Sequence, residues 1–228
     1  WKQLDPSYFA RHDPNELAWH ARSLWRHIET TIPVVRARPS PLGEGLQVLM
    51  FSPDRSDLFA RICGYFDGAG FSIQDAKIHT TNAGYALDTF QVVNPAYEDD
   101  GPAGYRDLIS LVEHQAALAA ASTGPLPTPR SSRVSRRVKS FPVVPRVSLR
   151  PDERAQRWLL SISTSDRSGL LYAVARVLAQ YRINLQLAKV SSLGERVEDT
   201  FLVDGAALQN NRLQIQVETE LLDAISAT

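Results

Sequence analysis

Two short turns carry the residue types that could bind a charged small molecule. The first, Asp54-Arg55-Ser56-Asp57, and the second, Asp166-Arg167-Ser168-Gly169, each follow an apolar run and precede a helical pattern. A helix N-terminus offers free N–H groups and the positive end of the helix dipole, and both favour a bound carboxylate. We call residues 54–57 the first corner and residues 166–169 the second corner. Their chemistry indicates binding of a zwitterion such as an amino acid.

The two corners are not equivalent. Gly169 removes a side chain, so that a ligand backbone can approach closely, and Asn184 in the next strand offers both a donor and an acceptor. The first copy has Asp57 and Ser72 instead, and Asp57 adds bulk and negative charge. The second corner is therefore the better candidate, and a capped turn without a ligand is the alternative. The candidate ligand-binding residues are Asp166, Arg167, Ser168, Gly169, Leu170 and Asn184, with Asp54, Arg55, Ser56, Asp57 and Ser72 as the less certain equivalent set.

Other chemical signals are weak. His12-Asp13 resembles the dipeptide of metal-dependent phosphohydrolases, but the further His and Asp of that ligand set are not evident. A loop before a helix is the favoured interpretation, and packing is favoured for His20. The sequence has no Gly-rich phosphate loop and no Gly-x-Ser-x-Gly elbow. We therefore predict no catalytic residue, no metal ligand and no cofactor in this chain.

An internal repeat positions both corners. A shift of 112 residues places Asp54-Arg55-Ser56 on Asp166-Arg167-Ser168, and it also aligns Gln74, Ala76 and Lys77 with Gln186, Ala188 and Lys189. After a one-residue gap, Asp88-Thr89-Phe90 falls on Asp199-Thr200-Phe201. Apolar positions stay in register over the same stretch, which indicates two tandem copies of one unit rather than two unrelated domains.

Each copy reads as ββαββα. Apolar runs at 46–51 and 158–163 predict strands, and the following apolar spacing predicts a helix with Ser56 or Ser168 as N-cap and Gly70 closing the first helix. Strands 71–80 and 183–192 follow, each forming a hairpin with a further strand that ends in Thr-Phe, and a bulge or strong twist is expected near residue 188. Second helices are expected near 105–121 and 210–225, and extra strands at 34–38 and 146–150. The fold class is α+β, with four-stranded antiparallel sheets and both helices on one face. In the competing order, residues 143–150 complete the first sheet.

The repeat also sets the expected domain organisation. Residues 1–31, with a helical stretch over 15–30, are expected to be the tail of a preceding domain. Residues 32–122 and 143–228 are the two copies, and residues 123–142 form a basic linker. The first residue is Trp1 and the sole methionine is Met50, so we expect the chain to be a piece of a longer protein.

Composition narrows the class of protein. The 228 residues have a formal net charge of zero, which gives no bulk attraction to nucleic acid or membrane. The single cysteine, Cys63, excludes an intramolecular disulfide and fits a cytoplasmic location. No apolar run approaches the roughly 18 residues of a membrane-spanning helix.

These motifs resemble those of ACT domains, which are amino-acid-binding regulatory modules. The resemblance rests on Asp-Arg-Ser-Gly-Leu at 166–170, Asn-Leu-x-x-Ala-Lys-Val at 184–190 and the Asp-Thr-Phe endings. The segments Tyr8-Phe9-x-Arg-His12, Ala18-Trp19-His20, Ser135-Arg136-Arg137 and 194–201 are similar to the C-terminal part of the bacterial bifunctional PII uridylyltransferase/uridylyl-removing enzymes, the GlnD family. In that family, residues 1–31 would end an HD phosphohydrolase region.

The resemblance implies a glutamine-sensing regulatory region without catalytic sites. The parent enzyme would be a nucleotidyltransferase that uridylylates the PII protein and a hydrolase that removes the group, using magnesium or another divalent metal in domains outside this chain. The implied partners are glutamine or another small amino acid, PII through the parent, and a second ACT domain within or between chains.

Two other functions fit the same elements. RNA-recognition modules share a similar sheet but need exposed aromatic residues on it. Here the strands at 85–92 and 196–203 each offer one Phe and lack the Lys/Arg-Gly-Phe signature. A stand-alone tandem ACT regulator, or a purely structural dimerisation unit, is the other alternative. Salt-dependent RNA binding would revive the first, and a parent gene without catalytic domains the second.

Overall fold

The computed structural model describes residues 4–94, 96, 101–129, 143–152, 157–165, 167, 169–190, 192–193 and 196–226. Asp166, Ser168 and most of the expected linker lie outside the described residues. The helices within them are α1 (Pro6–Arg11), α2 (Pro14–Leu24), α3 (Leu58–Ala69), α4 (Gly101–Ala121), α6 (Leu170–Gln180), the 3-10 helix η2 (Ala206–Gln209) and α7 (Asn211–Ser226). The strands are β1 (Val34–Pro39), β2 (Leu46–Pro53), β3 (Ser72–Lys77), β4 (Tyr85–Val93), β5 (Arg146–Pro151), β6 (Trp158–Ser165), β7 (Asn184–Lys189), β8 (Ser192–Leu193) and β9 (Arg196–Asp204).

The predicted order ββαββα is confirmed in both copies. The first unit runs β1-β2-α3-β3-β4-α4 and the second runs β5-β6-α6-β7-β9-α7, with β8 as a short addition that pairs with β9. β5 pairs with β6 from Arg146↔Ser163 to Pro151↔Trp158. The segment before the second copy therefore completes the second sheet, which settles the order that the sequence left open.

The sequence predicted some of the strand irregularities and helix ends correctly. The register shifts between Leu185 and Leu187 against β9, where a bulge was expected, and the equivalent shift occurs in β3. Gly70 ends α3 in the left-handed conformation as predicted, and Arg182 takes the same conformation after α6 with φ 52°. The N-cap prediction was wrong in both copies, because α3 has Asp57 as N-cap in place of Ser56 and α6 has Gly169 in place of Ser168.

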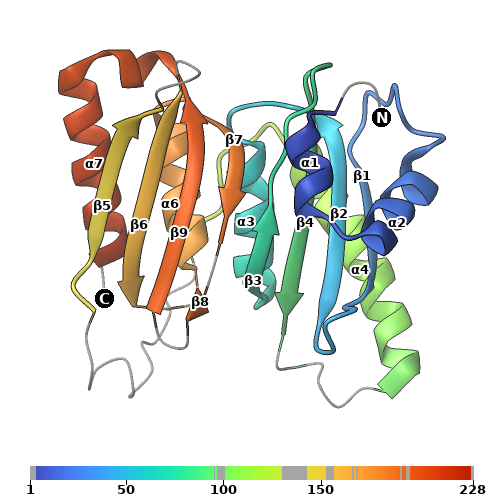
Figure 1. Cartoon of the computed structure of the whole chain (residues 1–228). Helices are drawn as coiled ribbons and strands as arrows, with labels where there is room; N and C mark the ends of the chain where they lie inside the picture. The colour runs from blue at the N-terminus through green and yellow to red at the C-terminus, as the bar shows by residue number, and fades with distance from the viewer. Residues whose placement is uncertain are drawn as a thin grey trace.

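The helices of each unit cover one face of the sheet, and α1 and α2 cross the opposite face of the first unit (Figure 1). Alternate residues of β2 therefore meet different cores: Val48 and Met50 pack with α3 and α4, while Leu49 and Phe51 pack with Tyr8 of α1. This explains why β2 is apolar along most of its length, whereas buried positions alternate in β6, which has no described helix on its second face.

The two sheets join into one where β3 lies beside β7, and we call this narrow contact, with the packing of α3 on α6 behind it, the seam. The strand order is β1-β2-β4-β3-β7-β9-β6-β5, and Lys77 of β3 pairs in register with Lys189 of β7 at its centre. Behind the seam α3 packs on α6 so closely that a Cβ on Gly64 would lie 2.8 Å from the Tyr172 ring. The seam is thus held by helix packing more than by strand pairing.

The helix in the N-terminal segment is shorter than the sequence predicted. The expected helical stretch from 15 to 30 ends at Leu24 in α2, and Ile28 beyond it is largely exposed. Among the described helices, none has the length and apolar character needed to span a membrane.

Candidate functional site

The seam brings each corner against residues of the other unit. Asn184 of β7 lies at the first corner, where its Nδ2 is 3.4 Å from Oδ2 of Asp54. Ser72 of β3 lines a cavity at the second corner together with Arg167 and Gly169. Asn184 and Ser72 are equivalent in the repeat, so the two units exchange these side chains. Each candidate site is therefore built from both copies.

The corner arginines have a structural role on the helix side of each unit. A guanidinium nitrogen of Arg55 donates to the carbonyl oxygens of Ala120 and Ser122 at 2.5 and 2.7 Å, at the C-terminal end of α4. The equivalent Arg167 donates to the carbonyl oxygen of Ala224 at 2.5 Å, near the end of α7. These bonds satisfy carbonyl groups that the last helical turn leaves free. The cited guanidinium nitrogens are therefore engaged away from the ligand, while Nε of Arg167 is buried without a hydrogen-bond partner among the described residues.

The first corner is filled by its own charges. Asp57 accepts ion pairs from Arg55 at 3.1 Å and from Arg61, one helical turn along α3, at 2.6 Å. The cavity beside Asp54 has a volume of about 10 Å³. That volume holds one water molecule at most.

Two acidic side chains lie behind the first corner. Asp54 accepts a hydrogen bond from the Thr80 hydroxyl at 3.0 Å, and Asp88 accepts one from the His79 backbone N–H at 3.2 Å. Burial raises the pKa of Asp54, against hydrogen bonds that lower it. Burial also raises the pKa of Asp88 well above its ordinary value, and the charge of Asp54 adds to the effect. Protonated forms of these groups are stabilised there.

The second corner differs at the first residue of its helix. Gly169 is the N-cap of α6 in the left-handed conformation, with φ 74° and no side-chain capping bond. A Cβ at Gly169 would lie 2.9 Å from Oδ1 of Asp67, which comes from α3 of the first unit. The cavity here has a volume of about 40 Å³ and reaches Asp199 of β9. Backbone N–H groups at the start of α6 thus face a space that already holds a neighbouring carboxylate.

Sequence reasoning missed Asp67 and Asp199 as site residues. A signal for Asp199 was present, because the Asp-Thr-Phe match places it opposite Asp88 in the repeat. Asp67 has Ala179 as its repeat equivalent, so no comparison of the copies could single it out. It reaches the second corner only because α3 and α6 pack together.

The His-Asp dipeptide serves as a helix boundary. His12 is the C-cap of α1, and Asp13 is the N-cap of α2, where its carboxylate accepts from the backbone N–H groups of Asn15 and Glu16 at 2.8 and 3.0 Å. This confirms the preferred interpretation of a loop before a helix. His20 is buried under α1, with its Nδ1 2.5 Å from the Tyr8 hydroxyl.

Comparison with known proteins gives consistent matches. Residues 1–23 match a family model described as the fifth domain of uridylyltransferase GlnD. Two proteins named bifunctional uridylyltransferase/uridylyl-removing enzyme, from Ralstonia nicotianae and Cupriavidus pinatubonensis, are 56% identical over 99% of this chain and 26% of their own length. The enzyme of that name from Burkholderia mallei is 53% identical over the same shares.

The chain spans about a quarter of the length of these relatives. Among solved structures, an aspartate kinase from Synechocystis aligns with 80% of this chain and 27% of its own, at 15% identity and a TM-score of 0.39. That likeness is too weak to support an inference.

Proposed function

The chain corresponds along 99% of its length to the C-terminal region of the GlnD bifunctional uridylyltransferase/uridylyl-removing enzymes, and on that premise we propose that it is the amino-acid-sensing regulatory region of such an enzyme. It carries out no chemistry itself. It biases the activities of domains outside this chain, which by the family's resemblance transfer uridylyl groups to PII and remove them with a divalent metal.

The second corner is the proposed binding site. The carboxylate of an amino acid binds at the uncapped N-terminus of α6, where the first N–H groups have no intrahelical acceptor. The ammonium group pairs with Asp67, whose carboxylate already lies beside Gly169. The observation that carries this proposal is the left-handed Gly169 in an interunit cavity, since no side chain of its own fills the helix end.

Ligand binding at this site must change the seam. A cavity of about 40 Å³ is far below the several hundred Å³ of typical small-molecule sites. An amino acid therefore requires the units to separate at the second corner, and it stabilises that more open arrangement by its differential affinity. The β3–β7 contact is narrow, so this movement must mainly loosen the packing of α3 on α6.

Arg11 connects the seam to the N-terminal helix α1. It lies at the end of α1, and its guanidinium donates to the carbonyl oxygens of Ile78 in the first unit and Ala188 in the second. Separation of the units would pull these two acceptors apart. A coupling of about 1–3 kcal/mol, typical of allosteric proteins, would suffice for a switch.

Calorimetry of the 228-residue chain tests this proposal. Glutamine, glutamate, asparagine and serine are titrated separately, and glutamine is expected to bind with millimolar or tighter affinity while the others bind more weakly. Gly169→Ala should abolish the heat, because a Cβ there fills the cavity and opposes the left-handed backbone. Absence of heat with every amino acid, in a chain that unfolds cooperatively, would reject the sensing role.

A further inference from the structure

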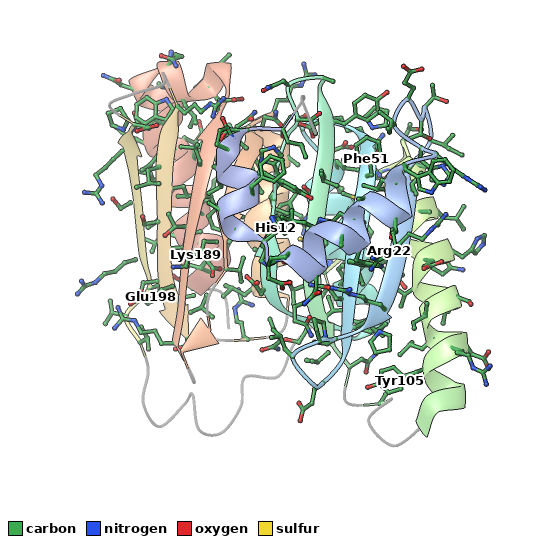
Figure 2. All side chains as sticks on the ribbon, turned by 45° about the vertical axis from the view of Figure 1, so that its right-hand side comes forward. His12, Arg22, Phe51, Tyr105, Lys189 and Glu198 are labelled. Atoms are coloured by element: carbon green, nitrogen blue, oxygen red, sulfur yellow. The ribbon has the colours of Figure 1, made fainter. Side chains whose placement is uncertain are left out.

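A buried polar cluster lies beneath the N-terminal helices, away from both corners. It contains His12 at the end of α1 and Glu16 and His20 one turn apart on α2, with side chains only 6%, 1% and 1% exposed. One possible ligand atom from each of the three lies within 4.8 Å of the others. Figure 2 shows His12 between α1 and α2, on the sheet side opposite the larger helices.

His12 presents an unsatisfied lone pair. Its Nδ1 lies 2.7 Å from the Tyr8 carbonyl oxygen, which can only accept, so Nδ1 carries the proton. Nε2 is then an acceptor, and it is buried without a hydrogen-bond partner among the described residues. Histidines that bind metal commonly donate their second N–H to a backbone carbonyl in this way. The orientation of His12 is therefore already that of a metal ligand.

The other two side chains complete a recognised donor set. His20 is held through Nδ1 by the Tyr8 hydroxyl and through Nε2 by the Thr89 hydroxyl, at 2.5 and 3.3 Å. Glu16 accepts from the Gln47 amide at 3.0 Å. Two imidazoles and one carboxylate form the ligand set of many zinc sites and leave one position for water. Ligands of tetrahedral zinc lie about 3.4 Å apart, so the side chains must draw together modestly.

Lys77 balances the charge of this cluster in the metal-free chain. Its Nζ lies 2.7 Å from Oε2 of Glu16. A dication bound by Glu16 would repel this ammonium group, so the two positive charges compete for one carboxylate. Lys77 is also the residue of β3 that pairs with Lys189 of β7, and its displacement would be felt at the seam.

We propose that His12, Glu16 and His20 bind a divalent transition-metal ion of the zinc class, with Lys77 as the competing cation. The site lies apart from both corners and uses none of their residues. Its donors are imidazole and carboxylate, which suit Zn²⁺ and Co²⁺, while Mg²⁺ prefers oxygen ligands alone. Selective binding of the first two ions is therefore expected.

The test uses the chelator-treated 228-residue chain without a histidine tag. Zn²⁺ titration by calorimetry should give one equivalent bound, and Co²⁺ should produce visible absorption bands of a low-coordinate site. His12→Ala should weaken Zn²⁺ binding about a hundredfold, since it removes a ligand. His114→Ala, on the exposed face of α4, is the matched control and should leave affinity unchanged.

Lys77→Met separates a metal site from an ordinary polar network. Removing the competing ammonium should tighten Zn²⁺ binding about tenfold, and Zn²⁺ should raise the melting temperature of this variant more than that of the unchanged chain. No Zn²⁺ binding by the folded chain would overturn the proposal. Binding that persists in His12→Ala, or that is unaffected in Lys77→Met, would overturn it as well.

Discussion

The first and second corners share one scaffold, and neither helix has a side-chain capping bond, but they differ in the residue at the N-cap and in where the nearest carboxylate comes from. In both, an arginine side chain holds the end of the unit's second helix, so this part of the repeat has a structural role. At the first corner Asp57 supplies a carboxylate from the helix itself and pairs with Arg61. At the second corner Gly169 supplies none, and the nearest carboxylate comes from Asp67 of the other unit.

Under the proposed function, the duplicated fold keeps its architecture in both copies while only the second corner receives a ligand. At the first corner the carboxylate of Asp57 belongs to the N-cap residue itself and is paired with Arg55 and Arg61. At the second corner the carboxylate belongs to a neighbouring unit, and its position depends on the seam. The same contact that closes the site therefore makes it responsive to separation of the units.

Gly169→Ala should have the largest effect, since it breaks the distinctive feature of the second corner. The left-handed backbone costs about 1–2 kcal/mol for a residue with a Cβ. Crowding against Asp67 should add about 1–3 kcal/mol, as overpacking does elsewhere. Urea denaturation measures the loss.

Gly68→Ala is the control for this change. Gly68 lies in α3 with open space around its Cβ position, so alanine should stabilise the chain by about 0.5–1 kcal/mol through helix propensity. Equal effects of the two substitutions would contradict the special role of Gly169.

Asp57→Ala changes the first corner instead. It removes the partner of Arg61, whose side chain is 6% exposed, and should cost about 1–3 kcal/mol because the cation stays buried. Amino-acid binding should be retained, as the second corner is untouched. A loss of ligand affinity in a folded Asp57→Ala variant would reverse the assignment of the two corners.

The pH dependence of stability should trace to the first corner. Asp54 and Asp88 have pKa values raised by burial above the ordinary 3.8, so the folded chain binds more protons than the unfolded chain between 3.8 and the raised values. The free energy of unfolding therefore falls as pH rises through that window.

Asp88→Asn keeps an oxygen acceptor for the His79 N–H and should raise stability near neutral pH by about 1 kcal/mol, with a flatter pH profile. Thermal unfolding across pH 4–8 checks this expectation. Asp223→Asn, on an exposed position of α7, should leave the profile unchanged. A steeper profile for Asp88→Asn would be contrary to the assigned sign.

Asn184→Ala should have the smallest effect. It removes one long hydrogen bond to Asp54, which keeps its bond from Thr80, so the loss of stability should be about 0.5–1 kcal/mol. Ligand binding should persist, because Asn184 lies at the first corner. The measurement is again urea denaturation, paired with calorimetry, and a lost ligand affinity would place the site at Asn184.

The repeat in the sequence predicts the fold well because strands and helices follow local patterns. The shift that aligns Gln74 with Gln186 also aligns β3 with β7, and the phase slip near residue 188 anticipates the bulge. Helix starts were less accurate, because Ser and Asp are both preferred N-cap types and Asp57 pairs with Arg61, one turn along the same helix, in place of capping it.

The candidate site depends on features with no local signal. The exchange of Asn184 and Ser72 between corners follows from the β3–β7 contact, which no periodicity encodes. Asp67 reaches Gly169 only through the packing of α3 on α6. The polar cluster around His12 combines residues of α1 and α2 with Lys77, far along the chain. Spacing of four residues between His12, Glu16 and His20 was a visible hint, although a helix boundary interrupts it.

The stoichiometry of glutamine binding tests the central claim most directly. Calorimetric titration of the 228-residue chain should give one molar equivalent, which disappears in Gly169→Ala and remains in Asn184→Ala. Two equivalent sites, or a single site lost in Asn184→Ala and kept in Gly169→Ala, would contradict the claim that only the second corner receives the ligand.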